Sequence, residues 1–165
     1  MHFQLTSNIT IPSSDPWTAI EDFYGMLDGN GYAINNLKLI LDRPDKTEIG
    51  FIRRSENATI QNLTFGNVEI RMNNSAVSFT REISIGAIVG YMDGGAITNC
   101  HVGTMRIYGE AHLSSNVYAN MGGVCGVNNG TMNICSVKYC GISGLGNIGG
   151  IAGKNMQYIN GCMVN

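Results

Sequence analysis

Gly86-Ala87-Ile88-Val89-Gly90 and Ile97-Thr98-Asn99-Cys100 are the two apolar segments that decide the fold of this chain. The pair recurs along the sequence, with a Gly-led first segment and a second segment about ten residues later. The other Gly-led segments are Gly50-Phe51-Ile52, Gly122-Gly123-Val124-Cys125-Gly126 and Gly149-Gly150-Ile151-Ala152-Gly153. Their second segments are Ile60-Gln61-Asn62-Leu63, Met132-Asn133-Ile134-Cys135 and Ile159-Asn160-Gly161-Cys162, and an earlier copy reads Leu27-Asp28-Gly29-Asn30-Gly31 and then Ile34-Asn35-Asn36-Leu37. Because such recurrence is typical of repeat architectures, the sequence predicts an array of stacked repeats.

Aligned copies place apolar residues in columns. The first three columns hold Ile34, Ile60, Ile97, Met132 and Ile159; then Leu37, Leu63, Cys100, Cys135 and Cys162; then Leu39, Phe65, Val102, Val137 and Val164. The middle copies continue through Val68, Met105 and Cys140 to Ile70, Ile107 and Ile142. Steps of two indicate a strand with one buried face, whereas the step of three requires a corner. Asn36, Asn62 and Asn99 fall at the first corner, where Asn tolerates left-handed backbone and stacked amides can form a ladder.

The spacing of the copies indicates that their connections vary while the core segments are kept. The Leu and Cys positions of the second column are 26, 37, 35 and 27 residues apart. No copy can bury its apolar column alone, but stacked copies can, at about 4.8 Å per coil. The sequence therefore predicts an all-β fold, a single-stranded parallel β-helix (β-solenoid) of about five coils. A Gly-rich β-sandwich is the alternative, and it ranks lower because sandwich strands need no shared column register.

The composition excludes several classes of protein. The 165 residues are 44% hydrophobic and 13% charged, with 22 Gly and 3 Pro, which argues against a disordered or collagen-like chain. A net charge of −2 provides no basic field for nucleic acid. No apolar run approaches the roughly 18 to 20 residues that cross a bilayer, and the first residues do not resemble a signal peptide. We therefore expect one β domain over residues 1–165, with no nucleic acid among its partners and no membrane insertion.

The Gly-led segments resemble the GLUG motif, a repeat of bacterial surface and secreted proteins. Residues 86–90, 122–126 and 149–153 carry its apolar-Gly part, although none has Leu at the second position. Residues 23–37 resemble the stretch that usually opens such arrays. The resemblance implies a right-handed parallel β-helix, used as an extracellular spacer, adhesive or accessory region without a catalytic centre. On this basis residues 1–24 are expected to form a lead-in or cap, and residues 25–165 the GLUG-like coils of a longer parent chain.

The five cysteines do not have the pattern of a disulfide framework. Cys100, Cys135 and Cys162 share an interior column, so we expect them to be buried as small apolar side chains, and Cys140 likewise. Cys125 aligns with Arg53, Val89 and Ala152, a position expected to face outward, and is therefore a candidate reactive thiol.

The segment Asp28-Gly29-Asn30-Gly31 could be read as a calcium loop or as a tight turn. An EF-hand loop needs a Glu at its twelfth position, and residue 39 is Leu. A tight turn is favoured because Gly and Asn readily supply positive φ angles.

Candidate binding residues lie in the long connections between copies. Residues 71–85 and 108–121 are insertions in adjacent copies that are expected to project side by side, and their candidate ligand-facing residues are Tyr108, His112 and Tyr118. An extra solvent-facing strand pair that merely closes the wider coils is the alternative reading. No Ser-His-Asp grouping or recurring carboxylate pair is found, so no catalytic, cofactor-binding or metal-binding residue is assigned, and no enzyme activity or cofactor is expected.

These features predict a non-catalytic structural or adhesive module of an extracellular or cell-surface bacterial protein. One alternative is a glycan-binding or polysaccharide-processing β-helix, and another is an accessory scaffold of a larger secreted peptidase. The expected partners are a host or bacterial surface protein or glycan, together with the rest of the parent chain.

Overall fold

The protein is built from parallel strands. The computed structural model describes residues 1–41, 45–72, 78–79, 81–108, 112–113, 118–142 and 146–165, and no helix occurs among them. Every strand pair formed by these residues is parallel. The all-β prediction is therefore confirmed, and the pairing argues against the antiparallel β-sandwich alternative.

The strands form a nine-stranded, a seven-stranded and a four-stranded sheet and a short two-stranded pair. The nine-stranded sheet contains β1 (His2–Gln4), β3 (Ile20–Phe23), β4 (Met26–Asp28), β8 (Ile52–Glu56), β9 (Thr59–Gln61), β13 (Val89–Thr98), β17 (Cys125–Asn133), β20 (Ala152–Asn155) and β21 (Tyr158–Asn160). The seven-stranded sheet contains β2 (Ile9–Thr10), β5 (Ala33–Asn35), β6 (Leu37–Leu41), β10 (Thr64–Met72), β14 (His101–Tyr108), β18 (Ser136–Gly141) and β22 (Met163–Val164). The four-stranded sheet contains β7 (Glu48–Ile49), β12 (Ile83–Gly86), β16 (Ala119–Gly122) and β19 (Gly146–Gly149), and the short pair is β11 (Ser78–Phe79) with β15 (His112–Leu113).

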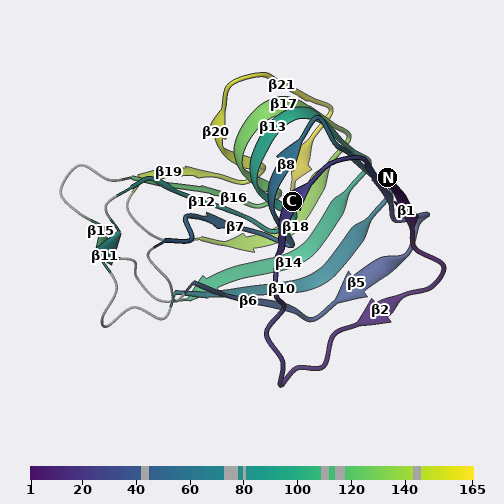
Figure 1. Ribbon diagram of the computed structural model, residues 1–165, viewed down its shortest axis with the longest axis horizontal. Coiled ribbons are helices and arrows are strands. Elements are labelled where there is room, and N and C mark those ends of the chain that lie inside the picture. The colour runs from purple at the N-terminus through teal and green to yellow at the C-terminus, as the bar shows by residue number, and fades with distance from the viewer. Residues whose placement is uncertain (42–44, 73–77, 80, 109–111, 114–117, 143–145) are drawn as a thin grey trace.

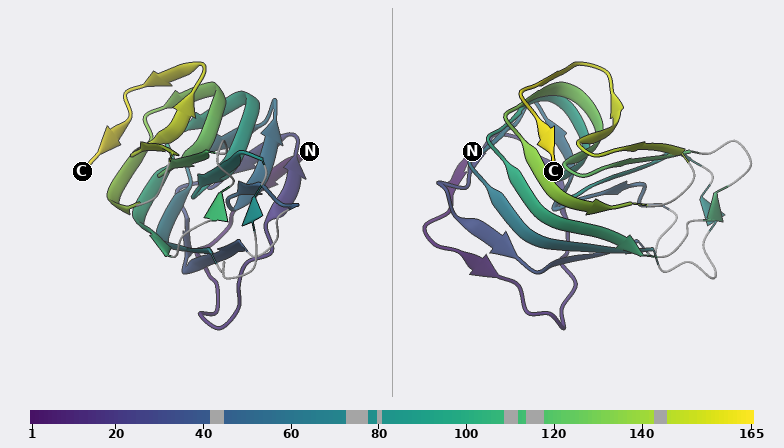
Figure 2. Two further views of the ribbon diagram at one scale, coloured as in Figure 1. Left: turned by 90° about the vertical axis from the view of Figure 1, so that its left-hand side faces the viewer. Right: turned by 180° about the vertical axis from the view of Figure 1, so that it is seen from behind.

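Successive strands of each sheet lie side by side in chain order. The purple N-terminal strands and the yellow C-terminal strands occupy opposite ends of the stack (Figure 1, Figure 2). The inward side chains of the three larger sheets form one apolar core. In this arrangement each inward residue of a central strand lies between equivalent residues of the two neighbouring strands.

The predicted columns are confirmed for the middle and last copies. Ile97 pairs with Ile60 on one side and with Met132 on the other, and Met132 pairs with Ile159. Val102 likewise lies between Phe65 and Val137. Within both columns the members at the centre of the stack are almost fully buried. The alternation read from the sequence therefore assigns inside and outside correctly in these strands.

The first copy is displaced from its predicted register. Ile34 pairs with Phe65 instead of Ile60, and the residue paired with Ile60 is Leu27. Leu37 and Leu39 consequently pair with Val68 and Ile70. The chain takes seven residues from Leu27 to Ile34 but five from Ile60 to Phe65, because a turn stands between them. These additional residues belong to the Asp28–Gly31 turn.

The Asp28–Gly31 turn has the form expected from its sequence. Asn30 and Gly31 have φ angles of 51° and 79°, and the Asn30 amide donates to Asp28 Oδ1 at 2.8 Å. The turn closes with the Tyr32 amide donating to the Gly29 carbonyl at 2.8 Å. Its glycines and Asn are therefore explained by backbone geometry.

One corner recurs through the stack with left-handed backbone. Asn62, Asn99, Ile134 and Gly161 occupy it, with φ angles of 54°, 52°, 53° and 60°. Asn99 Nδ2 donates to Asn62 Oδ1 at 2.9 Å, and Asn62 Nδ2 donates to Asp28 Oδ1 at 3.1 Å. The amide ladder is thus confirmed for Asn62 and Asn99, but Asp28 occupies the place predicted for Asn36.

The closing glycines of the Gly-led segments allow two layers of backbone to touch. A Cβ added at Gly90, Gly126 or Gly153 would lie 2.5, 2.4 or 2.3 Å from the backbone nitrogen of Ile49, Ile85 or Met121, respectively. Since β7, β12 and β16 carry those nitrogens, the start of β13, β17 and β20 packs directly on the four-stranded sheet. Any larger side chain would push the two layers apart.

Candidate functional site

The predicted ligand-facing residues are only partly brought together. Tyr108, at the end of β14, is 45% exposed, and Tyr118, just before β16, is 56% exposed. His112 lies in β15, paired with Ser78, and its side chain lies outside the described residues. The two insertions do run side by side, because β11 pairs with β15 and β12 with β16.

Part of each insertion belongs to the core, which differs from the solvent-facing strand pair of the alternative reading. Ile83 and Ile85 of β12 are fully buried, and so are Ala119 and Met121 of β16. The inward residues of β12 and β16 are therefore part of the core, and Tyr108 and Tyr118 remain as described candidates for binding.

A groove of about 260 Å³ crosses the seven-stranded sheet at Tyr108. Its lining residues are Ser13, Asn36, Asn67, Val68, Glu69, Thr104, Arg106 and Tyr108. Most of them lie on β10 and β14, where register places Asn67 beside Thr104 and Glu69 beside Arg106. The groove therefore offers an aromatic ring and rows of polar side chains that neighbouring strands hold in place.

Charged groups are paired along this groove. The Arg71 Nε donates to Glu69 Oε1, and the Arg71 guanidinium lies 6.0 Å from the centre of the Tyr108 ring. Amides, hydroxyls, a carboxylate and a guanidinium next to an aromatic face are the groups that bind the hydroxyls and the apolar faces of sugars. The arrangement can hold a small polar ligand, although its volume is below the roughly 300 Å³ of ordinary small-molecule pockets.

A second cluster of charges lies on the nine-stranded sheet, and the sequence analysis missed it. Arg54 donates to Asp93 Oδ2 at 2.7 Å and to Glu56 Oε1 at 3.1 Å, while Asn129 Nδ2 donates to Asp93 Oδ1 at 3.0 Å. The Arg54 guanidinium also lies 4.7 Å from the centre of the Tyr91 ring. Nearly all the polar groups of this cluster therefore have partners within it.

These residues come from different copies, which explains why they were overlooked. Register places Arg54 beside Tyr91 and Glu56 beside Asp93. Reading the columns of polar residues as well as those of apolar residues would have found the cluster. The cluster also affects Tyr24, because the negative charge of the Glu56 carboxylate raises the pKa of the Tyr24 phenol.

The asparagine corner continues into a histidine and a serine. His101 Nδ1 lies 2.8 Å from Ser136 Oγ, and His101 Nε2 lies 3.2 Å from Asn99 Oδ1. At the other end, the hydrogen bond from Gln61 is the main cause that lowers the pKa of Asp28. A hydroxyl, an imidazole and an amide in line resemble the parts of a nucleophilic site. Neither His101 nor Ser136 lines the groove at Tyr108.

The Cys125 thiol lies in the interior, so the prediction that it faces outward as a reactive thiol is wrong. Cys125 is fully buried, and burial raises the pKa of its thiol to about 12. It pairs with Val89, which pairs with Ile52 and not with Arg53, because the turn at Phe51 is one residue shorter than the turn at Ala87 and Ile88. The outward assignment came from aligning Arg53 without allowing for that difference.

The shared cysteine column behaves as expected at its centre. Burial raises the pKa of Cys100 and Cys135 to about 12, and both thiols donate to backbone carbonyls. Cys162 and Cys140 are half-buried, and the described cysteines are free thiols.

Neither the metal-ligating side chains of the described residues nor comparisons with known proteins identify a function. Among the described residues, no group of three or more His, Cys, Asp or Glu side chains could hold a metal ion, and none of the described segments is a helix capable of crossing a membrane. No family model, curated protein or solved structure matches the sequence. Inference about function therefore rests on the geometry of these residues.

Proposed function

We propose that the chain is a GLUG-like, right-handed parallel β-solenoid of about five coils. In this proposal it serves as a non-catalytic structural or adhesive module of an extracellular or cell-surface bacterial protein. The observation that carries the proposal is the continuous register: equivalent apolar residues lie over one another from β4 through β9, β13 and β17 to β21. A stack of this kind is stiff along its axis, because each coil is hydrogen-bonded to the next.

The polar surface supports a passive role. The corner side chains bond to one another along the stack, and the Arg54 cluster is satisfied by its own members. Groups that already have partners stabilise the coil contacts and are poorly placed to bind and release a substrate. Burial of the Cys125 thiol removes the most obvious nucleophile.

Turnover assays test the absence of catalysis. The purified chain is incubated with acidic polysaccharides and with an activated ester, and no product above the buffer rate is expected. His101→Ala and Ser136→Ala are the informative variants, because these side chains form the described His–Ser contact. Turnover by the parent chain that disappears in both folded variants would contradict the proposal.

A glycan-binding module is the second candidate, and the groove at Tyr108 favours it. Binding to a glycan array is measured for the parent chain and for Tyr108→Ala, and the variant is expected to lose at least about tenfold in affinity, as aromatic anchors do. Tyr24→Ala is the matched control, because Tyr24 is 57% exposed and lies outside the groove. Equal loss in both variants, or no bound glycan at all, would exclude this candidate.

A further inference from the structure

The strands of the seven-stranded sheet are basic, although the whole chain has a net charge of −2. They carry four Lys or Arg residues, Lys38, Arg71, Arg106 and Lys138, and one acidic residue, Glu69. The strands of the nine-stranded sheet have the opposite balance, with five acidic residues, Glu21, Asp22, Asp28, Glu56 and Asp93, against three basic ones, Arg53, Arg54 and Lys154. Since charges of one sign on one face create a local potential, the outer face of the seven-stranded sheet is suited to an anionic ligand.

Arg106 presents an open guanidinium group on this face. Its side chain is exposed, it lines the groove at Tyr108, and it forms no ion pair with the described residues. Its register partner on β18 is Gly141, where an added Cβ would come no nearer than 3.8 Å to the Arg106 side chain. Because β18 thus places no side chain against Arg106, the guanidinium donors can reach a ligand in the groove.

The neighbouring carboxylate does not cancel this positive charge. Register places Glu69 between Lys38 and Arg106, and Arg71 Nε donates to Glu69 Oε1. Three basic side chains therefore surround one carboxylate. Arg106 can then form with a ligand carboxylate the two parallel hydrogen bonds to which its planar group is matched.

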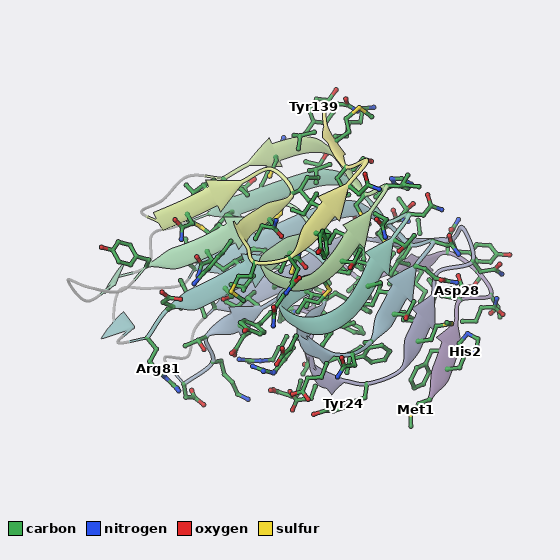
Figure 3. The ribbon with its side chains drawn as sticks, turned by 90° about the horizontal axis from the view of Figure 1, so that it is seen from above. Met1, His2, Tyr24, Asp28, Arg81 and Tyr139 are labelled. Atoms are coloured by element: carbon green, nitrogen blue, oxygen red, sulfur yellow. The ribbon has the colours of Figure 1, made fainter. Side chains whose placement is uncertain are left out.

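Aromatic rings stand on both sides of Arg106 along the same face. Tyr108 follows it by two residues on β14, and Thr104 precedes it by two, so all three side chains point the same way. Thr104 pairs with Tyr139 of β18, which is 61% exposed and lies at the periphery of the stack in Figure 3. Lys138 Nζ lies 5.6 Å from the centre of the Tyr139 ring and adds positive charge there. The face therefore combines exposed ring surfaces with cationic groups between and beside them.

We propose that this face binds an acidic glycan, with Arg106 holding the carboxylate of a uronate while Tyr108 and Tyr139 contact sugar rings. The inference rests on the glycan-binding candidate and deepens it, because it names the class of sugar and the residue that selects it. A neutral sugar could use the aromatic rings but would leave the guanidinium without an anionic partner. Discrimination between acidic and neutral sugars thus depends on Arg106.

Calorimetric titration of the 165-residue chain with hexagalacturonate and with its fully methyl-esterified form tests the proposal. The ester keeps the sugar rings and removes the charge, and the acid is expected to bind at least about tenfold more tightly. Arg106→Gln should lose about tenfold in affinity for the acid and leave the weaker binding of the ester unchanged. Tyr108→Ala should weaken the binding of both ligands, because the ring contact does not depend on charge.

Arg81→Gln is the matched control. Arg81 is also exposed, does not line the groove, and lies well away from Tyr139 in Figure 3, so the variant should bind the acid as the parent chain does. Circular dichroism and thermal melting verify that each variant is folded.

The outcomes separate this inference from the glycan-binding candidate. Equal affinity for acid and ester, or equal losses in Arg106→Gln and Arg81→Gln, would overturn the inference. The candidate would still stand in that case if Tyr108→Ala weakened binding. A chain that binds neither ligand would also overturn the inference, and the glycan array would then decide whether the candidate falls with it.

Discussion

At the scale of single residues, Ile134 has a backbone conformation that is unfavourable for its side chain, and the other described non-glycine residues with positive φ are all Asn. It has a φ angle of 53°, at the corner that Asn62, Asn99 and Gly161 occupy in the neighbouring copies of the repeat. Left-handed backbone costs an L-residue about 1–2 kcal/mol, and more for a β-branched side chain. Ile134 is also 60% exposed, so burial of its side chain offsets little of this conformational free energy.

Ile134→Asn is therefore expected to stabilise the protein. The change relieves the left-handed strain and places an amide next to Asn99, at the open end of the ladder. A gain of about 1 kcal/mol would raise the melting temperature by about 2–4 °C for a domain of this size. Ile134→Gly is the control that relieves strain without extending the ladder, and it should gain less because Gly also loosens the unfolded chain. A lower melting temperature for the Asn variant would contradict this account of the corner.

Cys125 allows a prediction about reactivity and pH. With its pKa raised to about 12 by burial, the thiol stays protonated in the folded protein, whereas in the unfolded chain it titrates near the ordinary value of about 8.5. Its contribution to stability is therefore complete below about pH 8.5 and declines as pH rises toward 12. Mass spectrometry of peptides labelled at pH 8 should find half-buried Cys162 modified first, and Cys125 only on unfolding. Rapid labelling of Cys125 in the folded protein would show that the assigned burial is wrong.

At the scale of strands, the alternation of β13 and β14 controls which substitutions are tolerated. Val102 of β14 is 1% exposed and lies between Phe65 and Val137, whereas Thr98 of β13 is half-buried, next to the fully buried Ile97. The two positions are close in sequence, but Val102 faces the core whereas Thr98 is partly exposed to solvent.

Val102→Asp should abolish cooperative folding, because it buries an unpaired charge in the stack, a loss of more than about 4 kcal/mol. Thr98→Asp should change the free energy of unfolding by less than about 0.5 kcal/mol. Urea unfolding followed by circular dichroism measures both. Similar losses in the two variants would mean that the alternation has been assigned to the wrong faces.

The sequence predicted these strands well because apolar spacing reports directly on burial. The sequence alignment failed where the connections differ in length. The turn at Asp28–Gly31 places Ile34 beside Phe65 and not beside Ile60. The shorter turn at Phe51 places Ile52, and not Arg53, in the column of Cys125, which is why Cys125 was wrongly assigned to the outward face. Turn length is set by backbone conformation, which leaves little trace in hydrophobicity. The Arg54 cluster was missed for a related reason, since its members meet only through register across copies.

At the scale of the whole molecule, each strand depends chiefly on its two neighbours. The central strands have partners on both sides, and their inward residues, such as Ile97 and Met105, are fully buried. The terminal strands have one described partner each and keep much of their apolar surface in contact with solvent. Stability in such a stack of strands is approximately a sum over the strands and the contacts between neighbours, so it should fall from the centre toward both ends.

Hydrogen exchange measured by mass spectrometry should reveal this gradient. Amides of β13 and β14 are expected to exchange slowest, and those of β1, β2, β21 and β22 fastest. Uniform protection would show that the protein opens only as one unit, contrary to the stacked description. The central strands serve as the internal reference, because they have partner strands on both sides.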